Sequence, residues 1–224
     1  GAPGIALPTL RHIFITHQHS DHNHDYGTLI LVAWAVGLDT RVDTWGPPPL
    51  EKMTRLFLEL NEYDINIRIK DEGYPPLAPL VHPHELTRGG KVLSEGPVKV
   101  TTTLVPHPIV EPALAYRFDT LDRSIVISGD TAPSDNLIQL AKGADVLVHE
   151  AMHLGGVDRL VARVPNHPGL RQHLLASHTT VEDVGRVAQE AGVKLLVLSH
   201  LVPADDPAIT DAMWIEGARA HFRG

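Results

Sequence analysis

Cysteine is absent from the 224-residue sequence, and this absence restricts the chemistry that the chain can perform. Without cysteine the chain forms no disulfide and offers no thiolate to a metal ion. Any transition metal that it binds must therefore be held by histidine and carboxylate side chains. A lack of disulfides is compatible with either redox compartment, so it does not indicate where the protein works.

Basic residues and long apolar runs are also scarce. The chain has 19 Lys and Arg against 27 Asp and Glu, which gives a formal net charge of −8. A protein that binds a polyanion usually shows the opposite balance, because phosphate contacts need Lys and Arg. The longest apolar window, residues 29–38, falls well short of the roughly 20 residues that a membrane span needs. We therefore expect a small-molecule substrate, and neither nucleic acid nor a membrane as the main partner.

The beginning of the chain is not typical of a natural start. Its first four residues, Gly1-Ala2-Pro3-Gly4, contain no Met and lead almost directly into an apolar strand. We interpret this as the interior of a longer protein, so targeting cannot be judged from it. We nevertheless expect the protein in the cytoplasm.

Hydrophobic periodicity predicts a mixed α/β fold in a single domain, residues 1–224. Helices are expected where apolar residues recur every three or four positions, at residues 26–36, 50–62, 137–141, 181–191 and 207–220. Strands are expected at residues 11–16, 41–45, 65–69, 98–105, 113–118, 124–128, 145–148 and 194–198. Thr179 or Thr180 is a plausible N-cap and Gly192 a C-terminal stop for the helix at 181–191. Residues 74–83 are rich in proline and are expected to form a loop.

Histidine, by contrast, is abundant, with 15 residues, and several of them follow predicted strands together with aspartates. The candidate metal ligands at four separate strand ends are His17, His19, Asp21, His22, His107, Asp130 and His200. Imidazole and carboxylate suit zinc, manganese or ferrous iron, and a shared carboxylate can hold two ions about 3.5–4 Å apart.

Each of the later candidates has a simpler interpretation when it is taken alone. A single His107 or His200 is more often a hydrogen-bonded structural histidine, and a Gly-Asp-Thr turn is more often a tight turn or a helix cap. The dense run at residues 17–22 is not explained in this way. The combination therefore predicts a two-metal centre. His12 is expected to face the back of its strand, and loops or the surface are expected for His24, His82, His84, His153, His167 and His173.

These motifs resemble those of the metallo-β-lactamase superfamily over residues 10–200. The resemblance rests on Thr16-His17-Gln18-His19-Ser20-Asp21-His22, the distant His107, Gly129-Asp130-Thr131 and Ser199-His200. Further details resemble its ribonuclease Z and arylsulfatase-like branch, namely Trp45-Gly46-Pro47-Pro48, His149-Glu150-Ala151 and Ala176-Ser177-His178-Thr179-Thr180.

The resemblance implies a four-layer αββα sandwich and a pair of zinc ions per chain, with manganese or iron as alternatives. One metal would be held by His17, His19 and His107, the other by Asp21, His22 and His200, with Asp130 shared by both. His178 would act as an acid or transition-state stabiliser, with Glu150 as its partner. A helix-start histidine that faces solvent is the alternative for His178. Asp21 counts among the catalytic candidates as well, and we expect a homodimer.

Two features depart from the family's pattern. Only about ten residues precede the strand that leads into the Thr-His-x-His run, so the first strands of the sandwich would be missing unless another chain completes the sheet. We expect roughly 60–90 further residues in the intact protein. Ribonuclease Z enzymes usually carry a basic arm between the positions of His107 and Asp130, where this chain has room only for a short strand pair. Residues 157–175 form an Arg-bearing insertion that is expected to be a lid, an anion-recognising wall or an ordinary surface loop.

The sequence thus predicts a metal-dependent hydrolase that cleaves a small ester-like substrate through a metal-bridging hydroxide. A phosphodiester, aryl sulfate, lactone or related ester fits the same ligand set equally well. A ribonuclease Z-like RNA endonuclease and a non-catalytic metal-binding homologue are the alternatives.

Overall fold

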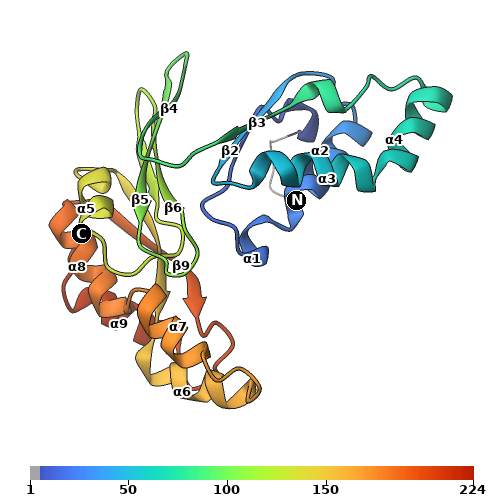
Figure 1. The fold of residues 1–224 in the computed structure, drawn as a ribbon. Helices are drawn as coiled ribbons and strands as arrows, with labels where there is room; N and C mark the ends of the chain where they lie inside the picture. The colour runs from blue at the N-terminus through green and yellow to red at the C-terminus, as the bar shows by residue number, and fades with distance from the viewer. Residues whose placement is uncertain (1–5) are drawn as a thin grey trace. The chain divides into compact units, whose positions relative to one another are not determined.

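The computed structural model describes residues 6–224, so the unusual start at residues 1–4 lies outside the described part. The chain divides into two compact units, residues 1–87 and residues 88–224. Each unit contains one sheet with helices packed against it, as Figure 1 shows. The predicted α/β class is therefore confirmed, with two sheets flanked by helices. No helix within residues 6–224 combines the length and the apolar character needed to cross a membrane.

The first unit contains a parallel three-stranded sheet in the order β1-β2-β3. Its strands are β1 (His12–Phe14), β2 (Val42–Gly46) and β3 (Val81–Glu85). Its helices are α1 (Ser20–Asn23), α2 (Asp25–Ala35), α3 (Leu50–Leu60) and α4 (Glu62–Ile67), with short helical turns η1 (Leu7–Thr9), η2 (Arg68–Glu72) and η3 (Ala78–Leu80). Alternate residues of β2 are buried, as expected for a strand with helices on one face.

Two predictions for this unit are wrong. Residues 65–69 are helical, divided between α4 and η2, and do not form a strand. Ile65 and Ile69, four positions apart, both belong to the core cluster, while Ile67 is 43% exposed, so the spacing of four decides the structure. Residues 74–83 are only partly a loop, because β3 begins at Val81. Pro83 is tolerated there because β3 is an edge strand.

The second unit contains a six-stranded sheet in the order β4-β5-β6-β7-β8-β9, antiparallel as far as β7 and parallel beyond it. The strands are β4 (Gly90–Glu95), β5 (Val98–Val105), β6 (Ala113–Asp119), β7 (Ser124–Ile127), β8 (Val146–Met152) and β9 (Leu195–Val202). The helices are α5 (Asp135–Ala141), α6 (Leu154–Arg163), α7 (Leu170–Ser177), α8 (Val181–Ala191) and α9 (Asp211–Arg219). The strand prediction missed β4, which is largely exposed.

Helix α8 matches its prediction at both ends. The hydroxyl of Thr180 accepts a hydrogen bond from the N–H of Asp183, and Gly192 ends the helix with φ +64°. Helix α9 begins later than predicted, because the hydroxyl of Thr210 caps it by accepting from the N–H of Met213. Helices α8 and α9 lie side by side in Figure 1, and their apolar residues pack with β8 and β9 in one core cluster.

Candidate metal centre

Four candidate ligands lie in the first unit, on the segment that leaves β1. This segment presents His17 and His19 and then enters the short helix α1, which carries Asp21 and His22. Nε2 of His17 lies 3.2 Å from Nδ1 of His19, and Nε2 of His22 lies 3.3 Å from a carboxylate oxygen of Asp21. The rings of His17 and His22 have centroids 4.1 Å apart. The run therefore folds into a compact group of imidazoles beside one carboxylate.

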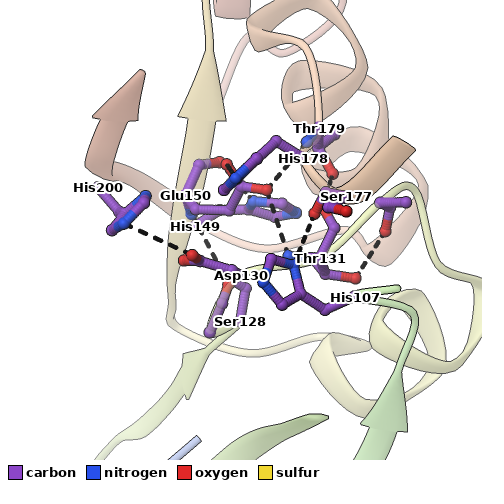
Figure 2. Close-up of polar contacts among 12 residues, drawn as sticks. His107, Ser128, Asp130, Thr131, His149, Glu150, Ser177, His178, Thr179 and His200 are labelled. Atoms are coloured by element: carbon purple, nitrogen blue, oxygen red, sulfur yellow. Dashed lines mark hydrogen bonds and ion pairs between the residues drawn. The ribbon is translucent and has the colours of Figure 1, made fainter. Parts of the chain in front are cut away.

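A second group lies in the second unit, after the end of β7, after the end of α7 and within β9 (Figure 2). It contains Asp130, His178 and His200, whose potential ligand atoms all lie within 4.8 Å of one another. Asp130 follows β7 after a turn in which Gly129 adopts φ +61°, a conformation that favours glycine. Nε2 of His200 lies 3.5 Å from a carboxylate oxygen of Asp130. The residue types and spacing of this His/Asp cluster fit a divalent transition metal.

His107 adjoins this second group and has a defined tautomer. It lies just beyond β5, it is fully buried, and its ring centroid lies 5.4 Å from that of His178. Nδ1 of His107 lies 2.9 Å from the backbone carbonyl oxygen of Ser177. Because a carbonyl oxygen only accepts, Nδ1 must carry the proton and the lone pair remains on Nε2. A metal-binding histidine commonly makes this hydrogen bond with its other ring nitrogen.

Glu150 and His178 form a buried pair next to Asp130. A carboxylate oxygen of Glu150 lies 3.3 Å from Nδ1 of His178. The other carboxylate oxygen accepts hydrogen bonds from the backbone N–H groups of Thr131 and Thr179, at 3.3 and 2.9 Å. Burial raises the pKa of Glu150 above its ordinary value, and His178 and the Thr179 N–H oppose that rise. Figure 2 shows this carboxylate held from several directions, so its position is well defined.

His178 lies between His200, a predicted ligand, and Glu150, whose carboxylate it contacts. Its ring is stacked on that of His200, with centroids 5.7 Å apart and an interplanar angle of 9°. It is 6% exposed, so the alternative of a histidine that faces solvent does not describe it. This placement lets His178 hold or release a proton beside a metal site.

Two of the histidines that were expected on loops or on the surface lie in regular elements, His173 in α7 and His84 in β3. His173 lies on α7 with its ring centroid 5.7 Å from that of His107 and 6.0 Å from that of His178. The only sequence signal for it is its spacing of four residues before Ser177, whose hydroxyl lies 3.2 Å from its Nδ1. In the first unit, His84 lies on β3, stacks on Trp45 and contacts Asp43 at 2.6 Å.

The insertion at residues 157–175 contains most of α6, the loop at residues 164–169 and most of α7. Its three arginines are paired with carboxylates, as Arg159 with Asp206, Arg163 with Asp205 and Arg171 with Asp158. The prediction of an ordinary surface loop holds only for residues 164–169, since the rest of the insertion is helical. The prediction of an anion-recognising wall stays a prediction, because the ion pairs of Arg163 and Arg171 are open to solvent.

Comparison with known families and sequences gives a consistent result. The family model described as "Beta-lactamase superfamily domain" matches residues 1–201. A protein named ribonuclease Z from Mycobacterium sp. (strain KMS) is 33% identical over 223 residues, which cover 99% of this chain and 75% of that protein. A ribonuclease Z from Mycobacterium bovis (strain BCG / Pasteur 1173P2) is 29% identical over 226 residues, which cover 100% of this chain and 78% of that protein.

Solved structures with the same fold include two that match equally well. The metallo-beta-lactamase fold protein YhfI from Bacillus subtilis has a TM-score of 0.64 at 21% identity, over 97% of this chain and 74% of that chain. Human tRNase Z, short form, has a TM-score of 0.64 at 20% identity, over 87% of this chain and 74% of that chain. At these identities the likeness establishes the fold and does not establish the substrate.

Proposed function

From the premise that the chain belongs to the metallo-β-lactamase superfamily and is a metal-dependent hydrolase, we propose that the bond it cleaves is a phosphodiester of RNA. The observation that carries this proposal is the buried Glu150–His178 pair beside Asp130 and His200. Cleavage of a phosphodiester needs a proton for the leaving oxygen, and a histidine held by a carboxylate can supply it. Relatives named ribonuclease Z, at 29% and 33% identity, support RNA as the source of the phosphodiester. This proposal replaces the small ester-like substrate that the sequence favoured.

We expect the proposed centre to hold two zinc ions per chain. By the family motifs, His17, His19 and His107 would hold one ion, Asp21, His22 and His200 would hold the other, and Asp130 would be shared by both. When bound, such a metal pair supplies Lewis acidity and lowers the pKa of a water molecule. The Nδ1–H of His107 that bonds to the Ser177 carbonyl supports this assignment, because it leaves Nε2 available as a ligand.

The residues of the second unit have separate roles in this proposal. His178 gives a proton to the leaving oxygen, and Glu150 orients its ring through Nδ1 and stabilises the charged imidazolium. The backbone N–H groups of Thr131 and Thr179 hold the Glu150 carboxylate in place. Burial of this pair excludes water from the proton that is transferred.

The proposed acid is tested with His178→Ala, for which we expect kcat on precursor RNA to fall by about 10²–10⁴-fold while metal content is retained. His167→Ala is the matched control, because His167 is an exposed histidine on the loop between α6 and α7. Turnover and metal content of both variants are measured on the same metal-loaded preparation. A His178→Ala protein with unchanged turnover would contradict the assignment.

A small ester is the second candidate substrate, and a specific observation favours it. The chain joins β5 to β6 through residues 106–112 and β6 to β7 through residues 120–123, so it has no protruding arm at this place. The acidic net charge of −8 also offers little attraction to a polyanion. Hydrolysis of nitrophenyl sulfate or a lactone that exceeds cleavage of precursor RNA would support this candidate.

We propose a homodimer that uses an exposed apolar stripe on α3 and α4. The stripe consists of Leu56, Leu60, Tyr63 and Ile67, spaced three or four residues apart, and Leu60 and Tyr63 are more than 80% exposed. Such a stripe on a helix can be buried against the same stripe of a second copy. Sedimentation velocity should detect a dimer that Tyr63→Glu dissociates and that Glu95→Lys, on β4, leaves intact. A monomer at all concentrations would refute the proposal.

A further inference from the structure

The pairing of β8 with β9 contains an irregularity at a proposed ligand. Glu150 pairs with Ser199 and Ala151 pairs with Leu201, so the register shifts at His200, which is one extra residue in β9. His200 has φ +42° and is the only non-glycine residue with a positive φ within residues 6–224. A β-bulge of this kind turns the extra side chain away from the direction that a regular strand would give it. The direction of the His200 ring therefore depends on this bulge.

The imidazole of His149 lies at the same irregularity. Nδ1 of His149 is 2.7 Å from the backbone carbonyl oxygen of Glu150, the residue at which the register changes. A carbonyl oxygen accepts only, so the Nδ1–H of His149 is the donor. A bulge interrupts the regular hydrogen bonding between strands, and the imidazole supplies a hydrogen bond at that point. Figure 2 draws His149 and Glu150 next to each other on β8.

Packing alone does not account for a histidine at position 149. The side chain is fully buried, and its Nε2 has no hydrogen-bond partner among the described residues. A buried acceptor without a partner costs free energy, whereas an apolar side chain of similar size would fill this space without that cost. Burial also lowers the pKa of His149 to about 4, so the ring is neutral near pH 7 and carries a single proton. The hydrogen bond that Nδ1–H donates is therefore what this side chain contributes beyond packing.

We propose that His149 is a positioning residue that fixes the Glu150 carbonyl at the bulge and thereby sets the direction of the His200 ring. The same bond holds the backbone of Glu150, whose carboxylate contacts His178. The inference rests on the proposed function, in which His200 is a metal ligand. Residues that orient ligands in this way commonly affect metal affinity without touching the metal.

Three substitutions separate this role from simple packing. His149→Asn keeps an N–H donor at the position of Nδ1, His149→Gln moves the amide one atom further out, and His149→Leu fills the space without a donor. Zinc affinity is measured for each protein by competition with a chromogenic chelator. The free energy of unfolding of the metal-free proteins is measured in urea.

We expect the Leu and Gln variants to bind zinc about 10–100-fold more weakly and the Asn variant to stay close to the wild-type protein. A packing role predicts the reverse order, with the Leu variant equal or superior to the Asn variant in both measurements. That order would overturn the inference. A wild-type protein that binds no zinc would refute the proposed function, whereas tight binding by the wild-type and Leu proteins alike would refute only the role of His149.

Discussion

Acid should destabilise the metal-free protein through His149. This histidine is fully buried, and burial lowers its pKa from 6.5 to about 4. In the unfolded chain the same side chain takes up a proton near its ordinary pKa. Between these two values the unfolded state binds more protons than the folded state. The stability that neutral His149 allows is therefore present above pH 6.5 and is lost progressively as the pH falls towards 4.

The size of the effect follows from the two pKa values. A difference of one pKa unit corresponds to 1.36 kcal/mol, so the full shift amounts to about 3 kcal/mol. Most of this is lost between pH 7 and pH 4.5, where we expect a loss of roughly 2.5 kcal/mol from this residue alone. His149→Asn removes the titrating group and keeps a donor at the position of Nδ1. Between pH 7 and pH 4.5 the unfolding free energy of His149→Asn should therefore fall by roughly 2.5 kcal/mol less than that of the wild-type protein.

The assay is urea unfolding of both proteins, followed by circular dichroism at several pH values in the presence of a chelator. The chelator removes bound metal, whose own pH dependence would otherwise add to the result. Other titrating groups contribute equally to both proteins, so the difference between the two curves isolates His149. Parallel curves for the wild-type protein and His149→Asn would refute the reasoning.

Two other substitutions test the packing and the electrostatics of the two units. Gly185→Ala places a methyl group 2.1 Å from the backbone oxygen of Ala218. It should destabilise the α8–α9 contact by about 1–3 kcal/mol in thermal unfolding, whereas Gly169→Ala, which meets nothing within 4 Å, should not. In the first unit, hydrogen bonds from Arg41 and then His84 hold the pKa of Asp43 at about 2. The resulting stability, about 1 kcal/mol after screening by water, exists above pH 4 and is lost towards pH 2. Asp43→Asn should abolish this dependence in acid titrations, and a dependence that persists would contradict the assignment.

The sequence was most informative where the signal is local. Helix α8 was predicted at both ends because Thr180 and Gly192 act on neighbouring backbone groups. The strand β5 was predicted with its bounds unchanged, since its residues are rich in Val and Thr. The ligand run at residues 17–22 was visible for the same reason, as its members are adjacent in the chain.

Features that depend on contacts between residues far apart in the chain could not be predicted from local sequence signals. The alternating isoleucines of residues 65–69 fit a strand and a helix alike, and only the core beside Ile65 and Ile69 selects the helix. His173 became visible near the site only when α7 placed it beside His107 and His178. The bulge at His200 depends on the register between β8 and β9, which a single sequence does not specify.

The choice of substrate is tested most directly by the ratio of kcat/KM for an RNA to kcat/KM for a small ester. The metal-loaded protein is given a precursor tRNA with a 3′ trailer and, separately, bis-nitrophenyl phosphate and nitrophenyl sulfate, and kcat/KM is measured for each. The proposed function predicts that kcat/KM for the RNA exceeds those for both small esters, and that Asp130→Ala abolishes all hydrolysis of the RNA. Turnover of a small ester with no cleavage of the RNA would contradict it.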